Sequence, residues 1–327
     1  PWMRRLFLVL AGLVVVVVVV VAGWWSGREP RLDAFQVAVE ELGIPLESTY
    51  TPLGDVTLFS VQAGPPGGPP VVLLHGFPEF WYAWKDVIAP LAAAGFRVIV
   101  PDQRGYGESD TPRDVAAYDV DRLGDDIAAL ISALGHARAA VAAHDWGGGV
   151  AWNLAIRHPG AVRRLAVIDT PHPDAWRMQE SQEETVSWFR TFFQVPWLPE
   201  WSARLGGWWL VSRMLRDSAA PGAFPDEKLA LYRSAWDRDG AFGTMVNWYR
   251  AAYRRPATEE PGAPRRVATP TLLILAPDDV FLPADLTRAS LQLLDEGRLV
   301  ELDAGTHWVL QERPAEIAAL LAEFFAE

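Results

Sequence analysis

Short apolar runs alternate with amphipathic stretches along residues 56–325, a pattern that predicts a mostly parallel β-sheet flanked by α-helices. Apolar runs of this length suit strands that are buried on both faces of a sheet. The predicted strands are residues 56–62, 71–75, 97–101, 139–144, 165–169, 271–275 and 299–302. The predicted helices are residues 81–94, 120–134, 147–157, 286–294 and 314–325.

This alternation is interrupted by residues 171–269, which hold eight of the sixteen tryptophans. The segment follows a predicted strand, and open α/β sheets bind ligands at the carboxyl ends of their strands. We therefore expect a mostly helical cap with an aromatic lining above the site. The chain divides into an N-terminal segment (1–27), a first core part (28–170), the cap (171–269) and a second core part (270–327).

Residues 6–25 carry no charge and are numerous enough to cross the hydrocarbon core of a bilayer, about 30 Å, as a helix. Trp24 and Trp25 at the end of this stretch suit the membrane interface. A small-residue cleavage site ends at Ala22. We expect a single-pass membrane protein with an N-terminal anchor, or a secreted protein if the segment is cleaved. The arginines are nearly balanced on the two sides, which leaves open the side that the domain faces.

The net charge of −12 argues against nucleic acid as a partner, because binding to the phosphate backbone needs a clustered basic surface. The chain has no cysteine, so disulfides and thiol chemistry are excluded. Composition does not indicate an oligomeric state.

Asp145 lies between a predicted strand and a predicted helix, on a tight turn that Gly147 and Gly148 permit. A side chain on such a turn is raised above the end of the sheet, beside a helix N-terminus that favours negative charge. The chain contains no G-x-S-x-G motif, so no serine competes for the position of a nucleophile. The alternative interpretation is that Asp145 only caps the helix.

Acidic and histidine residues follow the last two predicted strands. Asp278 and Asp279 come just after residues 271–275, and His307 comes just after residues 299–302. Nucleophile, acid and histidine therefore occur in the chain order of a hydrolytic triad, each at the end of a strand. Asp169, at the end of the fifth predicted strand, is an alternative acid.

Three motifs together resemble the α/β-hydrolase superfamily, and within it the epoxide hydrolases and the related haloalkane dehalogenases. The resemblance extends over residues 56–325. The motifs are HGFPE with WYAW at 75–84, DQRGYGES at 102–109 and HDWGG at 144–148.

The resemblance implies an α/β-hydrolase fold and an enzyme that opens apolar epoxides through an ester on Asp145. His307 would activate the water that hydrolyses this ester, and Asp279, which matches the family position better than Asp278, would orient the imidazole. The backbone N–H groups of Phe77 and Trp146 would form the oxyanion hole. No cofactor and no metal are implied.

Epoxide hydrolases also use two cap tyrosines to protonate the ring oxygen. Tyr249 matches the second of these, and Phe189 occupies the place of the first, which is a departure from the family pattern. We expect Phe189, Trp248 and Trp308 to contact the substrate.

Two other functions stay open at this stage. A haloalkane or haloacid dehalogenase would use the same Asp145, with the Trp146 indole and one of Trp176, Trp188 or Trp197 binding the halide. Against it, dehalogenases often carry Asn where this chain has Phe77. The other alternative is a membrane-tethered binding protein that has lost turnover.

Overall fold

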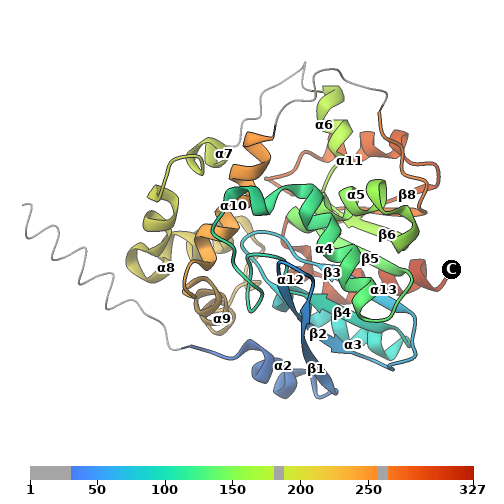
Figure 1. Cartoon of the computed structure of the whole chain (residues 1–327), viewed down its shortest axis with the longest axis horizontal. Coiled ribbons are helices and arrows are strands. Elements are labelled where there is room, and N and C mark those ends of the chain that lie inside the picture. The colour runs from blue at the N-terminus through green and yellow to red at the C-terminus, as the bar shows by residue number, and fades with distance from the viewer. Residues whose placement is uncertain (1–30, 180–187, 256–263) are drawn as a thin grey trace, which may run out of the picture.

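The computed structural model describes residues 31–179, 188–255 and 264–327 (Figure 1). The expected anchor or signal segment at 1–27 lies outside these residues. Within the described ranges, no helix combines the length and the apolar character needed to cross a bilayer.

An eight-stranded sheet forms the centre of the fold, with the strand order β1-β2-β4-β3-β5-β6-β7-β8. Strand β2 pairs antiparallel with β1 and with β4, and the other pairs are parallel. The strands are β1 (Leu46–Pro52), β2 (Thr57–Ala63), β3 (Pro70–Leu74), β4 (Arg97–Pro101), β5 (Ala139–His144), β6 (Val162–Ile168), β7 (Thr271–Leu275) and β8 (Gly297–Glu301). The prediction of a mostly parallel sheet is confirmed.

The strand order places a crevice at β3 and β5. The chain runs from β3 to β4 on one side, and β5 then joins β3 on the other side. The loops that follow two such strands diverge, and this is where open α/β sheets bind ligands. Asp145 follows β5, so the fold places it at this crevice.

Helices cover both faces of the sheet. Figure 1 shows α4 and α5 packed together on one face, whereas α3 packs with α13 on the other. The core helices are α2 (Ala34–Leu42), α3 (Lys85–Ala93), α4 (Val120–Ala133), α5 (Trp146–Arg157), α11 (Ala284–Ser290), α12 (Val309–Glu312) and α13 (Pro314–Ala326), with short 3₁₀ turns η1 (Trp81–Trp84), η2 (Val115–Tyr118), η3 (Pro159–Ala161) and η4 (Leu291–Leu293).

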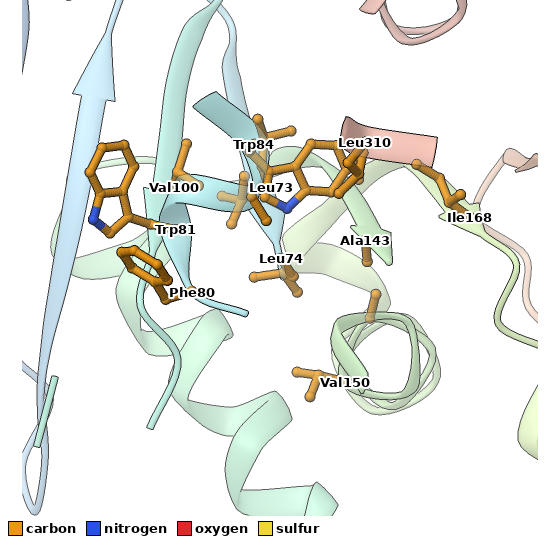
Figure 2. Close-up of a cluster of buried hydrophobic side chains, with 14 of the residues drawn as sticks. Leu73, Leu74, Phe80, Trp81, Trp84, Val100, Ala143, Val150, Ile168 and Leu310 are labelled. Carbon is orange, nitrogen blue, oxygen red and sulfur yellow. The ribbon is translucent and has the colours of Figure 1, made fainter. Parts of the chain in front are cut away.

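The core lies between the sheet and these helices. Figure 2 shows Leu73 and Leu74 of β3 among the side chains that the helices contribute, including Trp84, Val150 and Leu310. All five side chains are buried. Burial of a large apolar side chain contributes about 1.5–3 kcal/mol, so this packing stabilises the strands whose ends carry the site.

The cap is helical, as expected, and is inserted between β6 and β7. Figure 1 shows it beside the carboxyl ends of the parallel strands, with α8 as its outermost helix. Its helices are α6 (Pro173–Gln179), α7 (Trp188–Phe192), α8 (Leu198–Ser218), α9 (Asp226–Trp236) and α10 (Ala241–Arg254). Helix α8 is kinked at residues 205–208.

Each predicted core strand and helix is present, with shifts at the ends. Strand β1 and helix α2 were not predicted from the sequence. Strand β1 reads LESTYTP and lies at the sheet edge with mostly exposed or half-buried positions, so it has no apolar run. The predicted helix at 286–294 was wrong in its second half, where α11 ends at Ser290 and a 3₁₀ turn follows.

Candidate active site

Asp145 occupies a strained turn between β5 and α5. Its backbone is in the left-handed half of conformational space, with φ 51° and ψ −124°. A non-glycine residue in a rare backbone region costs on the order of 1–3 kcal/mol, and such residues cluster at functional sites. Asp145 is the N-cap residue of α5, but its side chain makes no capping hydrogen bond to the N–H groups beyond Trp146, so the interpretation of Asp145 as a simple helix cap is wrong.

The turn is tight because glycine lies on both sides of it. A Cβ at Gly76 would overlap the carboxylate of Asp145, and a Cβ at Gly147 would press on the carbonyl groups of Leu74 and His75. The two glycines therefore let the β3 and β5 loops approach each other. This approach brings the loop after β3 onto the Asp145 side chain.

Backbone N–H groups hold the Asp145 carboxylate. The N–H of Phe77 donates to Asp145 Oδ1 at 2.7 Å. Burial raises the pKa of Asp145, whereas the charge of His307 and hydrogen bonds from the N–H groups of Phe77 and Trp146 oppose that rise. The two expected oxyanion donors thus converge on one carboxylate.

His307 and Asp279 form the other half of the site. Nδ1 of His307 lies 2.7 Å from Oδ2 of Asp279. The other oxygen of Asp279 accepts hydrogen bonds from the N–H groups of Phe281 at 2.7 Å and Leu282 at 3.0 Å. The Asp279 carboxylate is therefore fixed in place, and Asp278, in contrast, is exposed.

Burial alone would lower the pKa of His307, but the negative charge and hydrogen bond of Asp279, with the charge of Asp145, raise it to about 9. Burial would raise the pKa of Asp279, but the imidazolium and the two backbone N–H groups hold it below its usual value. The pair is therefore an imidazolium and a carboxylate in the free protein.

His307 Nε2 lies 3.7 Å from Asp145 Oδ2, which is longer than a direct hydrogen bond. A water molecule held by Nε2 can therefore reach the carboxyl carbon of Asp145. The structure brings together Asp145, Asp279 and His307 as the sequence analysis expected.

Tyr249 of α10 faces this carboxylate from the cap. Burial and the charge of Asp145 raise the pKa of Tyr249 well above its usual value, and a hydrogen bond from the Trp146 side chain opposes that rise. An indole can only donate, so its N–H points at the phenol oxygen. The rings of Trp146 and Tyr249 meet edge to face with centroids 4.9 Å apart.

Phenylalanines surround the phenol of Tyr249. The Phe77 ring lies 5.1 Å from it, the Phe193 ring 4.8 Å and the Phe189 ring 6.0 Å. Phe189 also lies 6.5 Å from the ring of Phe281, next to the loop of Asp279. Phe189 thus belongs to the apolar side chains around Tyr249, namely Phe77, Phe189, Phe193 and Phe281, and we call this set together with the triad the catalytic chamber.

Two expected substrate contacts have other partners. Trp248 is buried, donates its indole N–H to the carbonyl of Arg104 at 3.0 Å, and packs against Trp146 with centroids 5.9 Å apart. Trp308 is buried and donates to Ser218 Oγ at 2.9 Å. Both side chains pack behind site residues, and contact with substrate remains a prediction for each.

The tryptophans named as halide ligands are dispersed. Trp197 is 81% exposed and Trp176 packs under the guanidinium of Arg190, 5.0 Å from the ring centroid. The side chain of Trp188 lies outside the described residues. The indole ring of Trp146 packs edge to face against Tyr249, with centroids 4.9 Å apart.

A buried polar cluster that the sequence pattern does not indicate lies behind the histidine. Glu79 Oε1 accepts hydrogen bonds from Tyr232 at 2.8 Å and Gln311 at 2.6 Å, whereas its Oε2 has no partner among the described residues. Oε2 lies 3.8 Å from Nδ1 of His144, and the His144 ring lies 4.6 Å from that of His307. Burial raises the pKa of Glu79 to about 7, which the Tyr232 hydrogen bond partly offsets.

Asp169 is the third member behind His307. Its Oδ1 accepts from the N–H of Ala276 at 2.6 Å, and burial together with the charge of Asp279 raises its pKa well above the usual value. Atoms of His144, Asp169 and His307 lie within 4.8 Å of one another. Nδ1 of His307 is bonded to Asp279, and the raised pKa of Asp169 disfavours the carboxylate form that a metal ion needs, so this donor set fits a metal ion poorly.

A cavity of about 420 Å³ lies elsewhere, between α9, β1 and the loop before α2. Arg31, Tyr50, Trp81, Glu108 and Arg238 are among its lining residues. The triad and Tyr249 are not part of its lining, so we do not place the chemistry there.

Comparison with known proteins agrees with this geometry. Residues 69–314 match the family model described as alpha/beta hydrolase fold. The chain is 38% identical over 272 residues to AB hydrolase superfamily protein YfhM of Bacillus subtilis (82% of this chain, 94% of the relative). It is 32% identical over 317 residues to Epoxide hydrolase A of Mycobacterium tuberculosis (86% and 98%).

Among solved structures, epoxide hydrolase A from Mycobacterium thermoresistibile superposes with a TM-score of 0.72 at 30% identity, covering 86% of this chain and 98% of that one. An epoxide hydrolase from Bacillus megaterium, in complex with an inhibitor, shares the fold with a TM-score of 0.74 at 23% identity, covering 86% and 100%. The chain therefore belongs to the α/β-hydrolase superfamily and, within it, to the epoxide hydrolase family.

Proposed function

We propose that the protein hydrolyses apolar epoxides to diols through an ester on Asp145. The observation that carries this proposal is the placement of three groups around one carboxylate. Asp145 Oδ2 lies 3.7 Å from Nε2 of His307, its Oδ1 is held by the N–H of Phe77, and the Tyr249 ring packs on the rings of Phe77 and Trp146 beside it. The similarity to epoxide hydrolases over most of the chain supports the same reaction.

In the first step, an Asp145 oxygen attacks a ring carbon and the carbon–oxygen bond of the epoxide breaks. A carboxylate can displace at a saturated carbon without first losing a proton. The ring oxygen takes the proton of Tyr249. Ester formation removes the Asp145 charge that raises the pKa of Tyr249, so the phenol becomes a stronger acid as it donates.

The same loss of charge prepares His307 for the second step. The charge of Asp145 is one of the causes that raise the pKa of His307, so the ester lowers that pKa. The imidazolium passes a proton back to the tyrosinate and becomes a neutral base.

His307 then takes a proton from water, and the hydroxide adds to the ester carbon of Asp145. The N–H groups of Phe77 and Trp146 stabilise the oxyanion, by roughly 3 kcal/mol per donor in comparable sites. Collapse expels the diol oxygen, which takes the acid proton from the new carboxyl group. The carboxylate and the imidazolium are then both restored.

The buried cluster flanks this second step. Glu79 Oε2 and the nitrogens of His144 have no hydrogen-bond partner in the described part of the chain, and both side chains adjoin His307. Buried polar atoms without partners are commonly satisfied by water. We propose that they hold a buried water molecule beside the His307 ring.

We also propose that residues 6–25 anchor the protein in a membrane as a single span. The support is the sequence, since twenty uncharged residues suffice to cross a bilayer. An anchored enzyme with an aromatic chamber suits substrates that dissolve in lipid.

The proposal is tested by supplying the full-length protein with an epoxide series and a haloalkane series and measuring diol and halide release. We expect diol from apolar epoxides and no halide above that of the Asp145→Ala variant. Halide release without diol would replace the proposal with a dehalogenase. Turnover of neither series would indicate a binding protein.

A further inference from the structure

Exposed apolar side chains are concentrated on one segment of the cap. Seven of the twelve exposed large hydrophobic residues among the described residues fall between 195 and 210. They include each exposed tryptophan among those whose side chains the structure describes. We call this set the tryptophan face: Val195, Trp197, Leu198, Trp201, Leu205, Trp209 and Leu210.

The exposure is large for residues of this size. Trp197 is 81% exposed, Trp209 60% and Trp201 45%. Single exposed apolar residues are normal on a protein surface, but a cluster of them marks a surface that contacts a membrane, a ligand or another protein. Tryptophan in particular favours the interface between a bilayer and water.

Arg250 holds the first part of the segment that carries the face. Arg250 donates to the carbonyl groups of Phe193 at 2.9 Å and Val195 at 3.1 Å, and pairs with Glu200 at 2.7 Å. Trp197 has a left-handed backbone, with φ 51°, between these anchoring points. The strained backbone of Trp197 is not offset by burial of its side chain within the described domain, because the residue is 81% exposed.

The face adjoins the catalytic chamber through the same stretch of chain. Phe193 lies 4.8 Å from the Tyr249 ring and 5.6 Å from the Phe77 ring, and Val195 and Trp197 follow it in sequence. At the end of the kink, the buried ring of Trp208 lies 5.3 Å from that of Phe242, and the Phe242 ring lies 5.8 Å from that of Phe77, measured between centroids. Apolar side chains therefore connect the face to the chamber.

The start of the described chain lies on the cap as well. The N–H of Leu32 donates to Ser234 Oγ of α9 at 2.9 Å. Figure 1 shows this start beside α9 and on the side of the molecule that carries α8, with the C-terminus on the opposite side. The first described residues therefore lie at the side of the molecule that carries α8 and α9, and the uncharged stretch at 6–25 precedes them in the sequence.

We propose that the tryptophan face lies in the lipid interface and that apolar epoxides enter the chamber from the bilayer. The proposed contact with lipid rests on the exposure of the tryptophan face, on its position at the cap, and on the apolar stretch at 6–25 that precedes the domain in the sequence. Entry of substrate from lipid rests in addition on the proposed epoxide hydrolysis. A bilayer is the occupant because the face is rich in tryptophan and the stretch at 6–25 is long and apolar enough to span one.

The absence of cysteine allows a direct test with the full-length protein. Trp201→Cys and Leu205→Cys are each labelled with an environment-sensitive fluorophore and reconstituted into phosphatidylcholine vesicles. Ala326→Cys is the matched control, since Ala326 is exposed at the C-terminal side of the molecule. The quenchers are a lipid with a nitroxide in its acyl chain and iodide in the buffer.

We expect the lipid nitroxide to quench the labels at 201 and 205 and iodide to fail, with the reverse result at 326. Access of iodide to all three positions would overturn the proposal. Shielding of 201 and 205 from iodide without quenching by the lipid would overturn it too, because a second copy or the chain's own N-terminal stretch would then cover the face.

Activity separates this inference from the proposed function. The variant with Trp197→Ser, Trp201→Ser and Trp209→Ser should keep its rate on a short water-soluble epoxide. It should lose about ten-fold or more on a long-chain epoxide dissolved in vesicles, because its apolar contact with lipid is weakened. Equal losses on both substrates would overturn entry from the bilayer. Lack of turnover by the unmodified protein would refute the proposed function and leave the labelling result standing.

Discussion

At the scale of single residues, three carboxyl groups surround the imidazole of His307 and have different roles. Asp279 bonds to Nδ1 at 2.7 Å, and Asp145 lies 3.7 Å from Nε2. Asp169 lies behind them, where burial and the charge of Asp279 raise its pKa well above the usual value. Two carboxylates are thus placed at the two nitrogens of the ring, and the neutral form is favoured for the third acid.

Replacing the two candidate acids by asparagine distinguishes their roles. Asp279→Asn removes the charge that orients His307, so ester hydrolysis should fall by about 10³-fold or more while the ester still forms. Asp169→Asn resembles the protonated acid and should change turnover by less than about three-fold. Single-turnover measurements of ester formation and decay distinguish the variants. A larger loss in Asp169→Asn would show that Asp169, at the end of β6, is the catalytic acid.

Phe189 is the position where a single hydroxyl group should increase the rate. Its ring lies 6.0 Å from that of Tyr249, so Phe189→Tyr adds a second donor near the developing alkoxide. One such hydrogen bond stabilises by about 1–3 kcal/mol, which corresponds to roughly ten-fold or more in the rate of ester formation.

The matched variant for this prediction is Phe189→Leu, which changes the ring without adding a donor and should give no gain. Tyr249→Phe should lose at least the factor that Phe189→Tyr gains. Pre-steady-state rates of ester formation measure all three. No gain in Phe189→Tyr would place the alkoxide out of reach of position 189.

The residues of the triad were predictable because each follows a strand in a fixed order. Asp145, Asp279 and His307 could be identified from position alone, since parallel strands bring their carboxyl ends to one edge. Glu79 and His144 could not, although both lie in the quoted motifs. Their significance comes from burial and from polar atoms without partners, and neither property is visible along the sequence.

At the scale of elements, Arg250 connects the helix of the proton donor to the segment before α8. Its guanidinium bonds to Glu200 and to the carbonyl groups of Phe193 and Val195, and its side chain is 10% exposed. Tyr249 is its neighbour on α10. The ion pair and the phenol are therefore positioned by the same turn of helix.

Removing this guanidinium should loosen the cap. Arg250→Ala leaves Glu200 and two carbonyl groups without their partner, so we expect a loss of about 2–4 kcal/mol in the free energy of unfolding and a slower ring opening. Arg213→Ala is the control, because Arg213 is 59% exposed and pairs with Asp217 one turn away, which should cost less than about 1 kcal/mol. Urea unfolding checks both values, and equal losses would show that Arg250 is not a structural anchor.

Core elements followed the sequence pattern more closely than the elements around them. Strand β5 is buried at each position and matches its predicted bounds, because an apolar run between polar turns has few alternatives. Strand β1 was missed since it is held by pairing with β2 rather than by apolar burial. The kink in α8 depends on Gly206 and Gly207 in left-handed conformations within a tertiary frame.

At the scale of the whole molecule, Glu79 makes stability depend on pH. Its pKa is about 7 in the folded protein, against 4.5 in an unperturbed chain. Between these values the folded state retains a proton that the unfolded state has released, so stability falls as pH rises through this window. The loss is roughly 3 kcal/mol when complete.

Glu79→Gln has no titrating group and should lack this loss. The free energy of unfolding of the variant minus that of the unmodified protein should therefore rise by roughly 3 kcal/mol from pH 4.5 to pH 8. Urea midpoints at the two pH values give the difference, and Asp303→Asn, at an exposed position, is the control. If the variant and the unmodified protein differ in stability by the same amount at both pH values, Glu79 is ionised in the folded protein at both.

The central claim is that Asp145 bonds covalently to substrate, and His307→Gln tests it most directly. This variant retains the nucleophile and lacks the base that releases the product. After exposure to an apolar epoxide, mass spectrometry of the proteolytic fragments should find the mass of the epoxide added to Asp145. An unmodified Asp145 in a variant that still produces diol would contradict the account, because water would then open the epoxide directly.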